Sequence, residues 1–336
     1  MPGPAGQVRI GQWLTGALRG RRGFSIYYQD CDAHIIDYEI YQLPGIDGVF
    51  RGPPIKSEEY VACVGAAQTF GRFVQTPFPR LISRTLGIDA LNLGRGAAGP
   101  AFFLSNPRLM EYINRARIAI VQVLSGRSQS NSLFSIVGNG MHGINLVDGR
   151  ELSADQFYTW LMGQDAQLAQ KIVAETRENY VLAMTQLLDA IKPPKILFWF
   201  SVRSPEYQEH LKLPLGDLWG KFPHFVNRAM VNQMRSHADV YAECISRRGL
   251  PQPLFDRSGN PTSFKIFSSW PSEVVTRTEN RYYPSPEMHE EAATLLIPCL
   301  QQVLGGGQGQ LARAESVEDE QRDRKQGLHM PDAGNL

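Results

Sequence analysis

The sequence lacks the features that assign a chain of this size to a membrane or secreted class. No run approaches the roughly 18 apolar residues that a membrane helix needs. Residues 1–23 carry arginines on both sides of a short apolar stretch and lack the continuous apolar core of a secretory signal. The cysteines form no CxxC pair and stand far apart, at Cys31, Cys63, Cys244 and Cys299. We therefore expect a cytoplasmic protein with reduced thiols and no membrane span.

The chain also lacks an excess of either charge and any spacing typical of a metal site. It has 34 Lys and Arg against 33 Asp and Glu, so no nucleic-acid partner is expected. No group of His, Cys and carboxylate residues has zinc-ligand spacing, and we predict no metal. Gly94-Arg95-Gly96 is not a dinucleotide fingerprint, because the third glycine would fall at Gly99, directly before Pro100. The cofactor therefore stays unknown.

What the chain does contain is enough apolar residues, 43% of 336, for one sizeable core. Residues 1–23, rich in Gly and Arg, predict a mobile N-terminus. Residues 305–336 carry many charges and few large apolar side chains, which predicts a disordered tail. Between them we expect a single α/β domain over 24–304, with an aromatic-rich lead-in at 24–58 packed on it.

Short apolar runs alternate with helical patterns from residue 60 onward. Five runs predict strands: Tyr60–Gly65, Ala90–Gly94, Ile118–Leu124, Lys195–Phe200 and Phe264–Ser268. Helical spacing predicts helices over Thr69–Leu86, Leu109–Arg115, Phe157–Ile191, Asp217–Arg248 and Glu287–Leu304. Ser153 and Gln156 have the spacing of a capping box before the third of these. The alternation favours a three-layer α/β sandwich with a mostly parallel five-stranded sheet of flavodoxin-like topology.

Ligands of such sheets collect outside the carboxyl ends of the strands. Polar or glycine-rich segments stand at these places, over residues 65–71, 92–96, 125–131 and 201–205, and a further one, 283–289, precedes the last helix. Arg127 and Arg203 in these segments would bind a carboxylate, phosphate or sulfate. The alternative for Arg127 is a structural pairing with a nearby carboxylate.

The order of these segments resembles the motif order of the SGNH, or GDSL-like, hydrolase superfamily. Gly65 and Gly71 have the spacing of its first block, and Asn92-Leu93-Gly94 is similar to its second. His289, followed by an Ala-rich helix, resembles the histidine of its last block. The resemblance implies an SGNH-hydrolase-like layout with His289 as the catalytic base.

The departures from that pattern fall on the catalytic positions. Ala67 stands where the family has its nucleophilic serine, Pro286 where it has the aspartate, and Arg127 where it has an asparagine. A Ser-His-Asp hydrolase needs a hydroxyl, a base and a group that orients the base, so a standard esterase is not expected.

Longer strings are similar to an uncharacterised proteobacterial domain-of-unknown-function family. They are GAAQTFGRFVQTPFP, NLGRGAAGP, SGRSQSN and YYPSPEMHEEAA. The GAAQ block also resembles the GNCQ block of capsular-polysaccharide acyltransferase-like proteins. These resemblances imply that the polar residues of the segments form a site of their own.

We assign catalytic roles to His289, as a general base with a pKa near neutrality, and to Gln68, at the place of the missing serine. The candidate substrate-binding residues are Thr69, Asn92, Arg127, Ser128, Asn131, Arg203 and Ser285. Glu287 or Ser285 would replace the missing aspartate as the partner of His289. The alternative for Glu287, which we favour, is a first-turn acid that stabilises the helix dipole. Ser125 and Ser128 are alternative nucleophiles, and Thr69 has the alternative role of a helix cap.

Three functions follow. The first is a group-transfer or carbohydrate-modifying enzyme in which His289 deprotonates an acceptor hydroxyl and the arginines hold an anionic ligand. The second is a non-catalytic binding module for an anionic sugar or nucleotide. A scaffold for polysaccharide assembly, contacting a partner through its aromatic N-terminal region, is a third. The first requires His289 and Arg127 to face one cavity, and the oligomeric state stays open.

Overall fold

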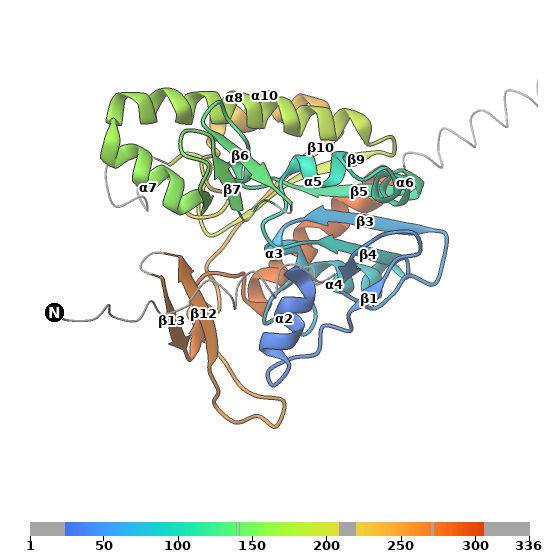
Figure 1. The fold of residues 1–336 in the computed structure, drawn as a ribbon. Coiled ribbons are helices and arrows are strands. Elements are labelled where there is room, and N and C mark those ends of the chain that lie inside the picture. Colours follow the sequence, from blue (N-terminus) through green and yellow to red (C-terminus); the bar gives the residue numbers. More distant parts are fainter. Residues whose placement is uncertain (1–23, 139, 141, 208–219, 270–271, 306–336) are drawn as a thin grey trace, which may run out of the picture.

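The computed structural model of the protein describes residues 24–138, 140, 142–207, 220–269 and 272–305. Its central sheet has five parallel strands in the order β10-β9-β5-β3-β4 (Figure 1). In chain order they are β3 (Tyr60–Gly65), β4 (Asp89–Gly94), β5 (Ile118–Gln122), β9 (Lys195–Ser201) and β10 (Val240–Ile245). This is the strand order of flavodoxin-like sheets. The predicted α/β fold with a five-stranded parallel sheet is confirmed.

Two elements of the C-terminal half differ from the prediction. Within the region expected as a helix over Asp217–Arg248, residues 240–245 form the edge strand β10, and the described helices are only α10 (Arg228–Met234) and η2 (Arg235–His237). Phe264–Ser268 belongs to β12 (Phe264–Ser269), which pairs antiparallel with β13 (Ser272–Arg277) outside the central sheet. An edge strand is partly exposed, so β10 lacks the continuous apolar run that marks its neighbours.

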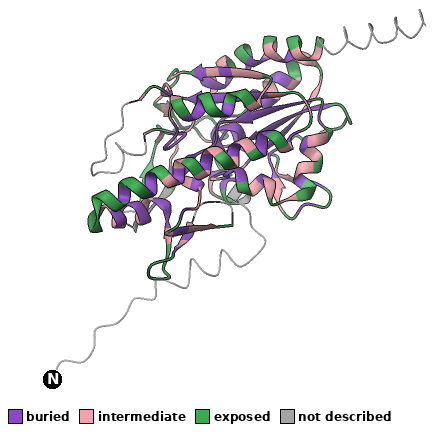
Figure 2. Cartoon of the chain, turned by 90° about the horizontal axis from the view of Figure 1, so that it is seen from above, coloured by how far each residue is buried: buried purple, intermediate pink, exposed green. Residues whose placement is uncertain are grey.

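Helices cover both faces of the sheet because successive strand residues point to opposite sides. On one face, side chains of β3 and β5 pack against α5 (Pro100–Leu104), α6 (Pro107–Arg115), α8 (Ala166–Ala190) and α10. On the other face they pack against α4 (Phe78–Leu86) and the last helix, residues 286–305. Figure 2 shows the strands buried between helices that expose only one side.

A three-stranded antiparallel sheet and a helix stand between β5 and α8. The strands are β6 (Phe134–Val137), β7 (His142–Asn145) and β8 (Glu151–Ser153), and the helix is α7 (Ala154–Gln164). The Ser153 hydroxyl accepts the backbone N–H of Gln156, and the Gln156 side chain accepts that of Ser153. The predicted capping box is therefore confirmed.

The lead-in packs on the segment that follows β3. It contains α2 (Phe24–Asp32), β1 (Tyr41–Gln42) and β2 (Val49–Phe50). Tyr28 and Tyr38 contact Phe70 of α3 (Ala67–Phe70) with ring centroids 5.4 and 4.8 Å apart. Asp32 and Arg72 form a buried ion pair at 2.7 Å, which joins the lead-in to the main sheet.

The remaining described elements are short: η1 (Gly126–Ser128), β11 (Gln252–Pro253) and β14 (Glu279–Asn280). None of the described helices is both long and apolar enough to cross a membrane. The predictions of a mobile N-terminus over 1–23 and of a disordered tail fall on residues outside those described, apart from Gly305, which ends the last helix.

Candidate functional site

His289 lies in the apolar layer beneath the last helix. Its side chain has no exposed surface and packs against the rings of Phe78 and Phe200. Nδ1 accepts the backbone N–H of Phe78 at 3.1 Å, and Nε2 has no partner in the described part of the chain. Burial, with a smaller effect of the Arg51 charge, lowers the pKa of His289 to about 3.

A pKa of about 3 does not match the near-neutral value expected for His289, and its catalytic role stays a prediction. The described neighbours of His289 are aromatic rings and Arg51, whereas those of Arg127 are Asp155 and Tyr282. Among the described residues, no hydrogen bond, ion pair or ring contact links His289 to Arg127. Neither Glu287 nor Ser285 replaces the missing aspartate, because Nδ1 of His289, which either would bind, already accepts the Phe78 N–H.

Several other candidates are engaged in holding the sheet edge together. The Thr69 hydroxyl donates to Gln122 Oε1 at 2.8 Å, and the Asn92 amide donates to the Thr69 carbonyl at 3.0 Å. Asn131 donates to the hydroxyls of Tyr158 and Thr176. These hydrogen bonds link neighbouring segments in the interior, which indicates a structural role for Thr69, Asn92 and Asn131.

Ser285 and Arg203 also bind the backbone. The Ser285 hydroxyl donates to the Arg248 carbonyl and accepts the Met288 N–H, as a helix cap does. The guanidinium of Arg203 donates to the carbonyls of Lys221, Pro223 and Val226. The prediction that Arg203 binds an anion is not supported, because these donors are already directed at carbonyl oxygens.

Arg127 differs from Arg203. It lies on η1, directly after β5, and its guanidinium makes no hydrogen bond to a described residue. Its ion pair with Asp155 of α7 is long, at 3.6 Å, and its side chain is 31% exposed. Arg127 therefore keeps its donors available at the sheet edge where ligands of such folds bind.

Tyr282 connects Arg127 to Gln68. Desolvation raises the pKa of Tyr282 to about 12, while the charge of Arg127 and a hydrogen bond from the Gln68 side chain lower it. The residue is nevertheless 41% exposed. Gln68 and Arg127, which were predicted from different strand ends, therefore both affect the pKa of this tyrosine.

Buried polar atoms without a partner lie in the same segments. They are Gln68 Oε1, at the start of α3, and the Ser128 hydroxyl, next to Arg127. Buried polar groups in folded proteins nearly always have partners, so these two atoms need an explanation. A carbonyl oxygen accepts hydrogen bonds only, which suits a hydroxyl group.

His224 is a residue that sequence analysis did not find. It lies between β9 and α10, and its Nδ1 is 2.9 Å from the Ser125 hydroxyl. Its ring stacks on Tyr282, with centroids 6.3 Å apart. Burial first, and then the charges of Arg127, Arg203 and Lys221, lower the pKa of His224 well below its usual value. The signal available was the aromatic string FPHF, which has no recognised spacing.

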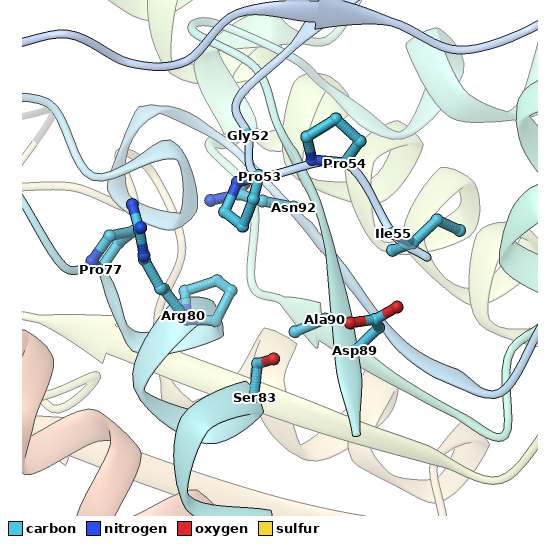
Figure 3. A pocket seen from close by; sticks show the side chains of 11 residues that line it. Gly52, Pro53, Pro54, Ile55, Pro77, Arg80, Ser83, Asp89, Ala90 and Asn92 are labelled. Carbon is cyan, nitrogen blue, oxygen red and sulfur yellow. The ribbon is translucent and has the colours of Figure 1, made fainter. Parts of the chain in front are cut away.

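A small pocket lies elsewhere, at the outer side of β4 (Figure 3). The lead-in, the start of α4 and β4 line it, with Pro53, Arg80, Asp89 and Asn92 among its residues. Its volume is about 20 Å³, which is room for about one water molecule. It is therefore too small for the predicted ligand, although Asn92 borders it.

The chain is thus a flavodoxin-like α/β protein with a polar cluster at the carboxyl edge of its sheet. A family model described as "Domain of unknown function (DUF6473)" matches residues 26–138 and 157–304. The chain therefore belongs to the DUF6473 family, since more than half of it is matched. No curated protein matches it.

Three solved structures are similar in layout, and all are carbohydrate esterases. A family two enzyme from Clostridium thermocellum, in complex with cellohexaose, is 9% identical over 76% of this chain and 66% of its own, with a TM-score of 0.37. A family 2 enzyme with a carbohydrate binding domain from Corynascus thermopiles (Myceliophthora fergusii) is 10% identical over 77% and 70%, with a TM-score of 0.36.

The third is a carbohydrate esterase whose active site displays divergent catalytic and non-catalytic binding functions. It is 13% identical over 78% of this chain and 69% of its own, with a TM-score of 0.35. The chain thus spans about two thirds of the length of these structures. They resemble it in the arrangement of the α/β layers, and the function must be argued from its own residues.

Proposed function

We propose that the protein binds an anionic, hydroxylated small molecule, such as an anionic sugar, at the carboxyl edge of its sheet. Arg127 would bind the anionic group, and Gln68 Oε1 with the Ser128 hydroxyl would bind hydroxyl groups. The observation that carries the proposal is the contrast among buried or half-buried arginines. Arg51 and Arg203 direct their donors at backbone carbonyls, whereas Arg127 has no such partner.

The chemistry of the neighbours favours a sugar over a simple anion. Asp155 and Gln68 Oε1 accept hydrogen bonds, and an inorganic anion at neutral pH has few protons to offer them. A sugar carries hydroxyl donors beside its charged group. The exposed ring of Tyr282 adds an apolar surface between these polar groups. A nucleotide has fewer hydroxyl groups for the same acceptors.

Calorimetric titration tests this function with glucuronate, glucose 6-phosphate and UDP, and with uncharged glucose for comparison. We expect the anionic sugars to bind and Arg127→Ala to weaken that binding by about 10- to 100-fold, the usual value of a charge-assisted contact. Arg108→Ala is the matched control, because Arg108 is exposed on α6 and pairs only with Glu111 there. Equal binding by Arg127→Ala, or none by the wild type, contradicts the proposal.

We also propose a cytoplasmic location. All four cysteines are unpaired, two of them buried in the core, which suits a reducing compartment. Fractionation of the native cells, with reduced and alkylated thiols counted by mass spectrometry, tests it. Thiols found oxidised in the native protein would contradict the proposal.

A further inference from the structure

Ser125 and His224 form a hydrogen-bonded pair beside Arg127. Ser125 occupies the N-cap position of η1, but its hydroxyl does not cap that turn. It lies instead 2.9 Å from Nδ1 of His224, which comes from a loop 99 residues away in the chain. A serine hydroxyl bonded to an imidazole is the arrangement that activates serine as a nucleophile.

The loop that carries His224 is held on both sides. The guanidinium of Arg203 donates to the Pro223 carbonyl before His224 and to the Val226 carbonyl after it. The Gly126 N–H donates to the His224 carbonyl at 2.9 Å, and Phe225 takes a left-handed φ of 68°. Left-handed conformations of large residues persist only where the surroundings enforce them. Arg203 is thus a positioning residue for His224.

Burial and the charges around His224 lower the pKa of its imidazole, which favours the neutral form. Burial is the largest cause, and Arg127, Arg203 and Lys221 add to it. The neutral imidazole is the form that accepts a proton from a hydroxyl. An anion bound to Arg127 would offset one of these positive charges and so raise the basicity of His224 when the ligand is in place.

We propose that Ser125 is a nucleophile and His224 its general base, acting on an ester of the anionic sugar bound by Arg127. The proposal rests on the proposed function and deepens it, since it names the reaction and the ligand class. The charge of Arg127 acts on His224, the hydrogen-bond partner of Ser125, so the anionic group bound by Arg127 would lie near this pair.

The reaction balances without a further reactant except water. The Ser125 oxygen bonds to the ester carbonyl carbon as its proton passes to Nδ1 of His224. The bond from that carbon to the alcohol oxygen breaks, and the alcohol takes the proton. Water, deprotonated by the same nitrogen, then attacks the acyl carbon, and the bond to the Ser125 oxygen breaks. The carboxylic acid leaves, and the proton returns from His224 to Ser125.

Ser128 provides a comparison within the same turn of the wild-type protein. Its hydroxyl is as buried as that of Ser125, at 4% against 5% residue exposure, but it has no partner among the described residues. If proximity to Arg127 alone made a serine reactive, both would react. The proposed pair requires that only the serine bonded to His224 does.

Labelling with a small alkyl fluorophosphonate, located by peptide mass spectrometry on the full-length protein, tests the pair. We expect one adduct, on Ser125, which Ser125→Ala abolishes and His224→Asn slows by about 100-fold or more. The control Ser236→Ala retains it, because the exposed Ser236 hydroxyl lies outside the site and donates to the Gln233 carbonyl. Circular dichroism confirms that each variant is folded. The proposal is overturned if the wild type takes no adduct on Ser125, or if His224→Asn is labelled as fast as the wild type.

The pH dependence of labelling tests the positioning role of Arg203. Removing its charge in Arg203→Ala raises the pKa of His224, so the midpoint of the labelling profile shifts to higher pH. A purely structural role would slow labelling without moving the midpoint, and that result overturns the assignment of Arg203.

Labelling and calorimetry separate the two proposals. The fluorophosphonate is uncharged and does not need Arg127. Anion binding without labelling overturns the Ser125–His224 pair and leaves the binding function. Labelling of Ser125 without anion binding overturns the proposed binding function, and with it the proposal that the substrate is a sugar ester.

Discussion

His289 and His224 are both buried histidines with lowered pKa values, but they lie in different surroundings. His289 is packed against the rings of Phe78 and Phe200, and its one described hydrogen bond is to a backbone N–H. His224 faces the Ser125 hydroxyl and lies near the charge of Arg127. Burial alone therefore does not distinguish a structural from a reactive imidazole. The partners of the ring nitrogens do.

The largest effect that we expect from changing one of these two histidines is on the stability of the fold. His289→Ala should lower the free energy of unfolding by about 3 kcal/mol, because it leaves a cavity and a buried Phe78 N–H without an acceptor. Anion binding should be unchanged. Urea unfolding and calorimetry measure the two, and His237→Ala, at the exposed pair with Asp189, is the control. Loss of binding with unchanged stability would reverse the roles of the two histidines.

The next effect is the acid sensitivity of the fold. The folded-state pKa of His289 is about 3, whereas an unfolded histidine titrates near 6.5. The unfolded chain therefore binds a proton in this window that the folded chain does not. Stability should be highest above pH 6.5 and fall toward pH 3, by about 1.4 kcal/mol per pH unit from this residue. Urea unfolding between pH 7 and 5 measures how the free energy of unfolding changes with pH. In His289→Ala this dependence should be weaker by up to one proton, and an unchanged dependence contradicts the assignment.

The smallest effect concerns the contact between η1 and the His224 loop. A Cβ at Gly126 would lie 3.1 Å from the His224 carbonyl oxygen, so Gly126→Ala shifts the loop by a few tenths of an ångström. We expect a stability change below about 1 kcal/mol and Ser125 labelling that is severalfold slower. Gly163→Ala on α7, where nothing lies within 4 Å, is the control. Equal labelling rates in both variants would show that the loop position does not matter.

The sequence allowed the parallel sheet to be predicted because β3, β5 and β9 are short, mainly apolar and buried, and β4 ends in four buried residues. The rule that ligands bind at strand ends then led to Gln68, Arg127 and Ser128. The strand β10 was missed because its exposed edge residues interrupt the apolar pattern. The run at Phe264 was misassigned because a local hairpin and a sheet strand have the same composition.

The catalytic roles were less predictable because they depend on contacts between distant segments. His289 stands at the place in the chain where the motif order of the SGNH superfamily has its histidine, but its side chain lies in the core. Thr69 and Asn92 are polar and stand at strand ends, but the Thr69 hydroxyl donates to Gln122 of β5 and the Asn92 amide donates to the Thr69 carbonyl. No spacing in the chain relates His224 to Ser125, since the fold alone brings them together.

The lead-in has a consequence for how the protein is shortened for experiments. Arg51 donates to the Phe70 and Gly71 carbonyls, and Asp32 neutralises Arg72 inside a group of aromatic rings. A version trimmed to begin at the first sheet strand would leave the Arg72 cation buried without its carboxylate, a loss that costs about 3–5 kcal/mol in typical cases. Recombinant boundaries should therefore start no later than Phe24, and failure of a shorter version to fold carries no information about oligomers.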